Sequence, residues 1–488
     1  MYLIKRLVPG LSVHAALCVA VITAAALLLR LRFYDRVSHD YEVFLQPWVE
    51  YYRRNGGFLA IKHNLGDYNV PYLYLLAFFS YLPINDMYLI KTASVLADLA
   101  MAVGFCWATL PYLPVAAPTP PPVRTLRTAH TAHTAHTTRT TRTAHTARTA
   151  RTAHTARTAN AARAARTRKI NHARASGPPS PHTQIWRVPL LYAVALFLPT
   201  VVLNSAHWGQ CDSLYAVFVV ISIGMLARGR GRVAVVMAAL AFSIKLQAVF
   251  FLPVGLVALM QKKLKWRELL WFPATYIITV LPAVALGKPP LETLMIYVNQ
   301  TQTYSSLLQW NAPSLFSLTG SLSPGVGFWL GLTAAAVCAA IMTLFAVRCQ
   351  LPLLHVAAAF SVFIPFLLPS MHDRYFYLAD VLCAGLAVTL PRRYWPAWAA
   401  AAFVQLGSYT AYHIYLFRTW LFGPLEFLPF DFRNSIAPGG VLMLLGGACL
   451  AWALARADRA TGGTADMADG NADGNADGNA DGAYRKLC

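Results

Sequence analysis

The chain has 488 residues, of which 57% are hydrophobic and 12% are charged, and its mean hydropathy is +0.46. About a quarter of the residues of a soluble domain are charged, so this composition excludes an ordinary soluble protein and indicates a polytopic membrane protein. The net charge of +21 does not imply a nucleic-acid partner, because most of the basic residues lie between the apolar runs. The eight cysteines show no CxxC spacing, so we expect neither a zinc site nor a disulfide framework.

The first apolar run, from Ser12 to Leu31, follows Lys5 and Arg6 and lacks a small-residue cleavage site. It predicts an uncleaved signal anchor with a cytoplasmic N-terminus. The positive-inside rule places the short Lys/Arg-rich loops that follow in the cytoplasm. An all-α fold with about twelve crossings results, at residues 11–31, 87–113, 188–203, 214–226, 233–244, 246–260, 269–286, 326–347, 353–368, 375–390, 397–415 and 441–455.

Two features of this topology are less regular. The region around Lys245 consists of two short halves, so it is either one re-entrant hairpin or two full spans. A group of arginines falls on the outer side and opposes the positive-inside rule, namely Arg30, Arg32, Arg36, Arg53 and Arg54.

Four regions are expected along the chain. Residues 1–112 hold the first span, a long outer loop and the second span, and residues 187–456 hold the remaining bundle. Between them, residues 113–186 contain Thr-Ala-His and Thr-Ala-Arg triplets and are expected to form a disordered, basic cytoplasmic loop. Residues 457–488, with repeated Ala-Asp-Gly-Asn, are expected to form a disordered tail.

The topology brings four polar clusters to the same non-cytoplasmic face. They are the first outer loop, whose acidic and aromatic part begins at Ser38 and is closed by the cluster Gly66 to Tyr72, and then residues 204–212, 299–313 and 371–377. Within that first loop, Gly56-Gly57 indicates a turn, and the apolar segment 68–82 is too short to span, so it predicts an interfacial helix.

Each cluster also has a structural interpretation. Asn204, His207 and Gln210 could merely cap helix ends, and Asp373 with Arg374 could form a local ion pair. Lys245 could extend its ammonium to the headgroups or contact a lipid phosphate. We interpret Asp98 as a buried polar contact between helices.

Taken in order, these motifs resemble the GT-C membrane glycosyltransferases. The nearest branch is the bacterial membrane proteins related to the second mannosyltransferase of GPI-anchor assembly, with the glucosyltransferases of N-glycan precursor assembly more distant. The resemblance rests on Asp40-Tyr41…Phe44…Pro47-Trp48, Gly56-Gly57, Asp67-Tyr68-Asn69-Val70-Pro71-Tyr72, Asn204-Ser205-Ala206…Trp208-Gly209-Gln210-Cys211-Asp212, Lys245-Leu246-Gln247-Ala248, Asn311-Ala312-Pro313 and Met371-His372-Asp373-Arg374-Tyr375. Asp373 stands where this branch is expected to have Glu.

The resemblance implies a GT-C-like fold and a hexosyltransferase that uses a polyprenyl-phosphate-linked sugar donor, a hydroxyl acceptor on a glycan, lipid or protein, and inversion. Mannose is the expected hexose. It also implies that Asp40 deprotonates or orients the acceptor hydroxyl.

A departing polyprenyl phosphate is an anion that fixed cations would stabilise, and Arg374, His372 and Lys245 are the candidates. Because these cations offset the phosphate charge, we expect no divalent metal and no cofactor. The other expected substrate contacts are Asp67, Tyr68, Tyr72, Trp48, His207, Trp208, Gln210, Asp212, Gln247, Asn311 and Tyr375.

The alternative is a transporter or flippase of a lipid-linked or polar solute. It predicts ionisable groups near mid-span and an internal repeat, and the sequence shows neither clearly. We therefore expect an integral membrane enzyme of the bacterial plasma membrane, or of the ER membrane in a eukaryote, with its site on the non-cytoplasmic face.

Overall fold

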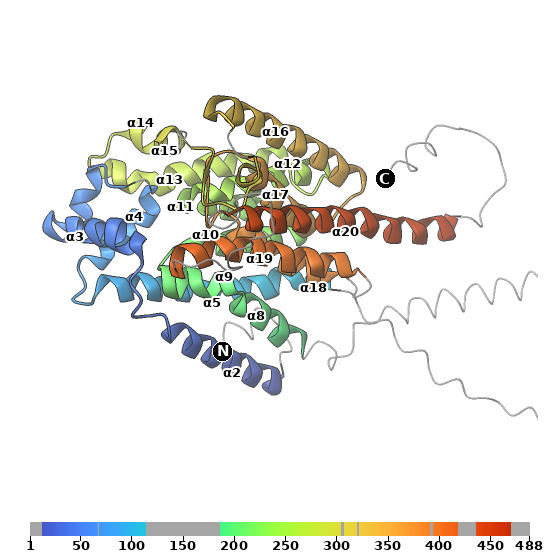
Figure 1. Ribbon diagram of the computed structural model, residues 1–488, viewed down its shortest axis with the longest axis horizontal. Coiled ribbons are helices and arrows are strands. Elements are labelled where there is room, and N and C mark those ends of the chain that lie inside the picture. Colours follow the sequence, from blue (N-terminus) through green and yellow to red (C-terminus); the bar gives the residue numbers. More distant parts are fainter. Residues whose placement is uncertain are drawn as a thin grey trace, which may run out of the picture. The chain divides into compact units, whose positions relative to one another are not determined.

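The structure is a computed structural model that describes residues 12–66, 68–113, 186–303, 307–319, 322–390, 394–417 and 436–469. All of these residues belong to one unit of the chain, which is almost entirely helical (Figure 1). The expected basic loop therefore lies outside the described residues except at its two ends, as does the tail beyond residue 469.

The helices keep the order that the apolar runs indicate. In chain order they are α2 (Val13–Leu31), α3 (Gln46–Arg54), α4 (Val70–Phe79), α5 (Asp86–Thr109), α8 (Arg187–Phe197), α9 (Pro199–Val202), α10 (Asp212–Ala227), α11 (Gly231–Ile244), α12 (Pro253–Met260), α13 (Trp271–Ala285), α14 (Pro290–Leu294), α15 (Ile296–Thr303), α16 (Pro324–Arg348), α17 (Leu353–Leu367), α18 (Tyr377–Thr389), α19 (Trp395–Phe417) and α20 (Ala437–Asp469). α20 thus continues past residue 456, where we expected the tail to begin.

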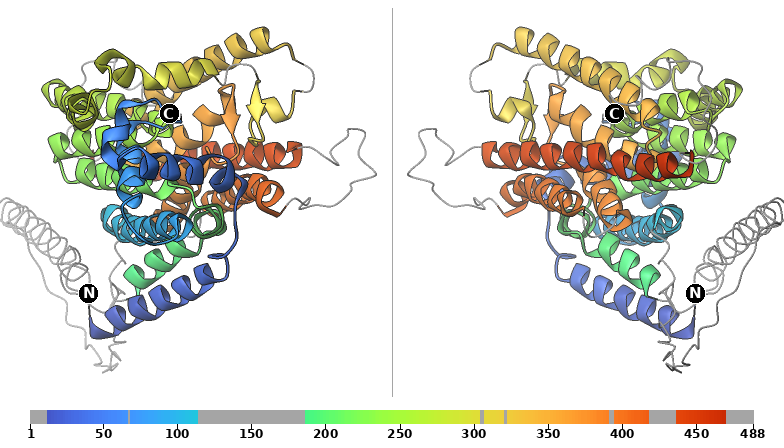
Figure 2. Two further views of the ribbon diagram at one scale, coloured as in Figure 1. Left: turned by 90° about the vertical axis from the view of Figure 1, so that its left-hand side faces the viewer. Right: turned by 90° about the vertical axis from the view of Figure 1, so that its right-hand side faces the viewer.

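Shorter elements join these helices. The π-helical turns are η1 (Tyr41–Leu45) and η4 (Leu203–Trp208), and the 3-10 turns are η2 (Gly57–Lys62), η3 (Leu110–Tyr112), η5 (Leu246–Phe251), η6 (Trp266–Leu270) and η7 (Leu315–Ser317). β1 (Gln309–Trp310) and β2 (Met371–His372) form a short parallel pair, drawn as yellow and orange arrows in Figure 2.

Five described segments are long and apolar enough to cross a membrane, which fits an integral membrane protein. They are Val13–Leu31, Asp86–Tyr112, Trp266–Ala285, Pro324–Arg348 and Ala437–Arg456, and a bent pair, Arg187–Phe197 with Pro199–Trp208, adds a sixth if it is one span. Helices also occupy the other expected crossings, but most of these are shorter, so the count of twelve stays a prediction.

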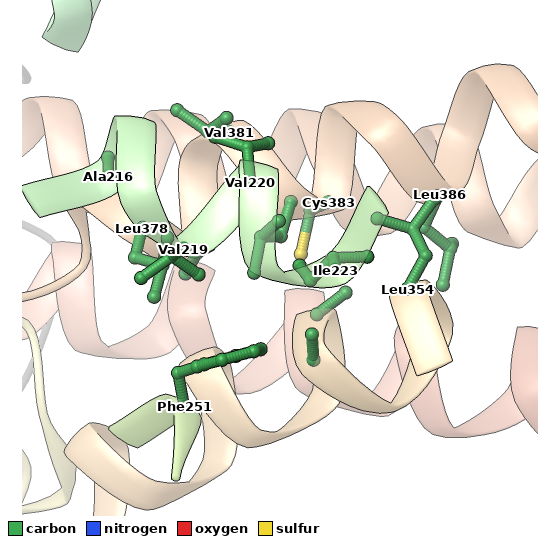
Figure 3. Close-up of a cluster of buried hydrophobic side chains, with 14 of the residues drawn as sticks. Ala216, Val219, Val220, Ile223, Phe251, Leu354, Leu378, Val381, Cys383 and Leu386 are labelled. Atoms are coloured by element: carbon green, nitrogen blue, oxygen red, sulfur yellow. The ribbon is translucent and has the colours of Figure 1, made fainter. Parts of the chain in front are cut away.

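The shorter apolar helices form the interior of the bundle. Val219, Val220 and Ile223 of α10 are fully buried, and they face side chains of η5, α17 and α18 (Figure 3). Between helices in a membrane the attraction comes from close packing and not from exclusion of water. The core therefore depends on the fit of these side chains.

α19 and α20 approach each other at glycines. A Cβ atom added to Gly407 would lie 2.9 Å from the carbonyl oxygen of Gly439, and one added to Gly446 would lie 2.8 Å from the Val404 side chain. Small residues allow such close contact of two backbones. This contact fixes α19, whose C-terminal end reaches the site described below.

A buried ion pair ties α2 to the rest of the bundle. Arg30 is 1% exposed, its Nη2 atom lies 2.8 Å from Asp98 Oδ2, and it also donates to the Leu196 carbonyl. Ser205 donates to the same Asp98 oxygen at 2.6 Å. The prediction that Asp98 makes a buried contact between helices is confirmed. Arg30 is neutralised inside the protein and is not a free loop charge, so it does not count against the positive-inside rule.

The first outer loop folds into η1, α3, η2 and α4, which gather at one end of the bundle near α14 (Figure 1). Gly56 and Gly57 have φ angles of +82° and +62°, so the expected turn between α3 and η2 is confirmed. A Cβ atom on Gly57 would also collide with the Tyr81 hydroxyl. α4 lies within the expected interfacial segment, and its orientation to the membrane stays a prediction.

Candidate functional site

A cavity of about 350 Å³ opens between the first outer loop and the ends of the bundle helices, within the range typical of ligand pockets. Stretches of chain that are far apart in the sequence line it together. Ten of the expected site residues are among its lining, namely Asp40, Trp48, Tyr68, Gln210, Lys245, Gln247, Asn311, His372, Arg374 and Tyr375.

Three donors converge on the Asp40 carboxylate, which directly precedes η1. Its Oδ2 atom accepts hydrogen bonds from Gln210 Nε2 at 2.6 Å and from Arg374 Nη1 at 3.0 Å. Its Oδ1 atom accepts one from the Tyr415 hydroxyl. Two residues earlier, Ser38 donates to the Trp208 carbonyl at 2.6 Å. The loop is therefore fixed to the bundle at two adjacent points.

The irregular end of the segment from α8 to η4 supplies two of the groups named above, the Gln210 amide and the Trp208 carbonyl. The chain bends by 59° between α8 and the α9–η4 segment, where Pro199 begins α9. η4 then ends at Gly209, whose φ of +75° suits glycine. π-helical turns are frequent at functional sites because they aim side chains away from the regular helical positions. The turn of the chain after η4 directs Gln210 towards Asp40, so Gln210 is not merely a helix cap.

Lys245 lies in extended backbone where α11 ends and η5 begins. Its side chain is 4% exposed and its ammonium pairs with Asp212, which is itself fully buried. The interpretation that Lys245 extends to the headgroups is therefore wrong. Asn204 also donates to Asp212, at 2.7 Å, and so does not simply cap its helix.

Arg374 lies between three carboxylates. Besides Asp40, its Nη1 atom is 3.8 Å from Asp373, and its Nε atom is 3.9 Å from Asp212. The local pair with Asp373 thus exists, but the contact with Asp40 is shorter. Its Nε atom has no hydrogen-bond partner within the described structure, so the guanidinium keeps donor capacity.

His372, an expected cation, lies beside Arg374 at the cavity. Burial and the neighbouring Arg374 lower the pKa of His372 to about 3. This direction favours a neutral imidazole that donates one hydrogen bond over a fixed cation. Burial raises the pKa of Asp373 to about 7, against the opposing effect of Arg374.

The two strands join segments that lie far apart in the chain. β1 and β2 pair Trp310 with His372, and the two rings stack at 5.6 Å with an angle of 8°. Asn311 follows with φ +56°, a left-handed conformation that asparagine tolerates better than most residues. Strain of this kind concentrates at ligand sites.

Four expected substrate contacts do not line the cavity in the described structure. Trp208 is 0% exposed and stacks on Tyr415 at 4.3 Å, so its expected contact with a sugar is wrong. Tyr72 is buried behind Tyr68, with ring centroids 4.8 Å apart. Asp212 contacts Lys245, Arg374 and Asn204. His207 packs between Phe33 and Phe417. The expected contact Asp67 lies outside the described residues.

Sequence reasoning missed several lining residues, namely Asn69, Tyr297, Gln300, Trp310 and Tyr415. Tyr415 stood out only as the end of an expected crossing. Trp310 and Gln300 fall inside an expected outer cluster, which gave the only signal for them. Among the described residues no group of three or more His, Cys, Asp or Glu side chains could hold a metal ion.

Residues 143–371 match the family model of glycosyltransferase family 87. The matched stretch contains Gln210, Lys245 and Asn311, ends one residue before His372 and does not include Asp40. No curated protein and no solved structure gave a match. The family match supports a glycosyltransferase, and the apolar helices fit a membrane protein.

Proposed function

We propose that the protein transfers a hexose from a polyprenyl-phosphate-linked donor to a hydroxyl acceptor, with inversion at the anomeric carbon, and that mannose is the sugar to test first. The match to glycosyltransferase family 87 supports the transfer of a sugar. The observation that carries the proposal is the meeting of Asp40 with Arg374 at the wall of one cavity. The mannosyl specificity rests on the resemblance to relatives of the second GPI mannosyltransferase.

Inverting transfer needs one base on the acceptor side and charge stabilisation on the side of the leaving phosphate. Asp40 is the base, because it is the carboxylate of the first outer loop that lines the cavity. Arg374 binds the departing phosphate through donors that it does not use for Asp40. Lys245 adds a second positive charge, and neutral His372 adds a hydrogen-bond donor.

Two cations and three carboxylates, those of Asp40, Asp212 and Asp373, share this site. Each cation is already paired, so the carboxylates hold the cationic groups in place before the donor arrives. Preorganised charge of this kind costs little reorganisation during the reaction. The burial that raises the pKa of Asp373 to about 7 also reduces the negative charge that would oppose a phosphate.

We place the site on the non-cytoplasmic face of the bacterial plasma membrane, or of the ER membrane in a eukaryote. The support is the charge of the loops, because Arg228 and Arg230 lie between α10 and α11, and Arg232 lies in the first turn of α11, at the other end of α10. Labelling with a membrane-impermeant maleimide tests this. His39→Cys should react in intact cells, and Arg230→Cys should react only after permeabilisation; the reverse pattern would place the site in the cytoplasm.

The activity is tested with the full chain reconstituted in liposomes and given radiolabelled prenyl-phosphate mannose, glucose, galactose or arabinose. We expect sugar to be released to water or passed to an added glycolipid, with inversion, for one hexose donor. Movement of the intact donor between leaflets without cleavage would favour the flippase, and use of nucleotide sugars alone would overturn the proposed donor class.

A further inference from the structure

We infer that Tyr415, at the end of α19, is a positioning residue that orients the Asp40 base; the inference rests on the proposed function. The Tyr415 hydroxyl donates to Asp40 Oδ1 from an element that lies 375 residues further along the chain. Tyr415 also lines the cavity, so the bond is made at the substrate space and not behind it.

The distribution of donors selects one oxygen of Asp40 as the proton acceptor. A carboxylate has about four acceptor positions. Gln210 and Arg374 occupy two on Oδ2, and Tyr415 occupies one on Oδ1. Among the described residues no donor fills the remaining position on Oδ1, so an acceptor hydroxyl would share this oxygen with Tyr415.

The acceptor O–H bond breaks and its proton passes to Asp40 Oδ1, while the acceptor oxygen bonds to the anomeric carbon. The bond from that carbon to the phosphate oxygen breaks, and its electron pair leaves on the phosphate. Tyr415 keeps its own proton throughout and holds the receiving oxygen in place.

The buried indole of Trp208 fixes the position of Tyr415. The Tyr415 ring stacks on this indole with centroids 4.3 Å apart and an interplanar angle of 17°, and Tyr412 meets the same indole edge-on at 5.1 Å. The guanidinium carbon of Arg374 lies 5.4 Å from the Trp208 ring centroid. The donors to Oδ1 and to Oδ2 therefore share one rigid support, which accounts for a fully buried tryptophan beside the site.

The hydroxyl should therefore act on the rate of the step and not on donor binding, because it contacts the base and not the phosphate site. Without it, the receiving oxygen of Asp40 loses a fixed partner, so kcat should fall while the affinity for the donor is kept. A residue that only supports the fold would change both quantities.

Tyr415→Phe tests the inference, because it removes the hydroxyl and keeps the stacked ring. We expect kcat with prenyl-phosphate hexose to fall by about tenfold, the loss expected for one hydrogen bond to a charged group, and KM for the donor to stay unchanged. Tyr412→Phe is the matched control, since Tyr412 also packs on Trp208 but its hydroxyl accepts from Asn204 at 3.0 Å; its kcat should stay close to wild type.

The outcomes separate the inference from the proposed function. An unchanged kcat in Tyr415→Phe, or an equal loss of donor affinity, would overturn the positioning role while leaving Asp40 as the base. Full activity in Asp40→Asn would overturn the proposed base and the inference with it. Tm values of the detergent-purified variants show whether each one is folded, and Tyr415→Leu, which loses both ring and hydroxyl, should be less active than Tyr415→Phe.

Discussion

Asp40 Oδ2 and Arg374 Nη1 lie 3.0 Å apart although 334 residues separate them in the chain. One residue belongs to the first outer loop and the other to the short link between α17 and α18. Both residues form part of the cavity wall, so the proposed base and the proposed phosphate site lie side by side.

Replacing Asp40 by Asn should remove the proposed base and keep the size of the side chain. We expect transfer to fall by about 10²- to 10⁴-fold, the usual contribution of general base catalysis. Protein yield and donor affinity should stay close to wild type, and a radiolabelled transfer assay with a donor-binding measurement checks both. Glu50→Gln, an exposed carboxylate of α3, is the control and should keep full activity.

Replacing Arg374 by Ala should weaken binding of the prenyl-phosphate donor by about 10- to 100-fold, because a charge-assisted contact to phosphate is lost. Arg374→Lys should recover only part of the affinity, since Lys lacks the planar fork of donors. Arg54→Ala removes an exposed ion pair with Glu50 and should change neither donor affinity nor rate. Unchanged donor affinity in Arg374→Ala would argue against phosphate recognition by this residue.

The Lys245–Asp212 pair should be strongly coupled. Lys245→Met leaves the fully buried Asp212 without its cation, and such a change costs about 3–5 kcal/mol. Asp212→Asn in the same chain should restore part of this loss, so the double variant should melt above the single Lys245→Met variant. Additive losses of stability in the double-mutant cycle would contradict a direct pair.

Asp373 predicts a dependence of stability on pH. Burial raises its pKa from the ordinary 3.8 to about 7, so between these pH values the folded protein holds a proton that the unfolded chain releases. Stability therefore falls as pH rises from about 4 to 7. Asp373→Asn cannot release a proton, so its Tm should exceed that of wild type by about 2 °C or more at pH 8 and by less at pH 5. An equal difference at both pH values would contradict the raised pKa.

The sequence allowed the helices to be placed, because apolar runs bounded by basic loops mark them clearly. It also grouped Asp40, Gln210, Lys245 and Arg374 at one end of the bundle, because loop charge decides which helix ends share a face. Loop charge does not show which residues of this group pair with each other. Lys245 was expected either to reach the headgroups or to contact a lipid phosphate, and only the three-dimensional structure shows that Asp212 pairs with it inside the protein.

Aromatic residues show the same limit of what the sequence can predict. Trp208 and Tyr415 are both aromatic residues at the ends of apolar segments, a pattern equally typical of membrane anchors and sugar platforms. Their roles depend on which ring covers the other. Trp208 is covered and Tyr415 reaches the cavity, and no local pattern in the sequence distinguishes them.

The two ties between the first outer loop and the end of η4, from Ser38 to Trp208 and from Gln210 to Asp40, join portions of the chain on either side of residues 114–185. A gene cut within that stretch would yield two polypeptides, neither of which holds a complete site. Transfer activity regained on co-expression would show that the two fragments associate in the membrane, so the activity itself would measure their assembly.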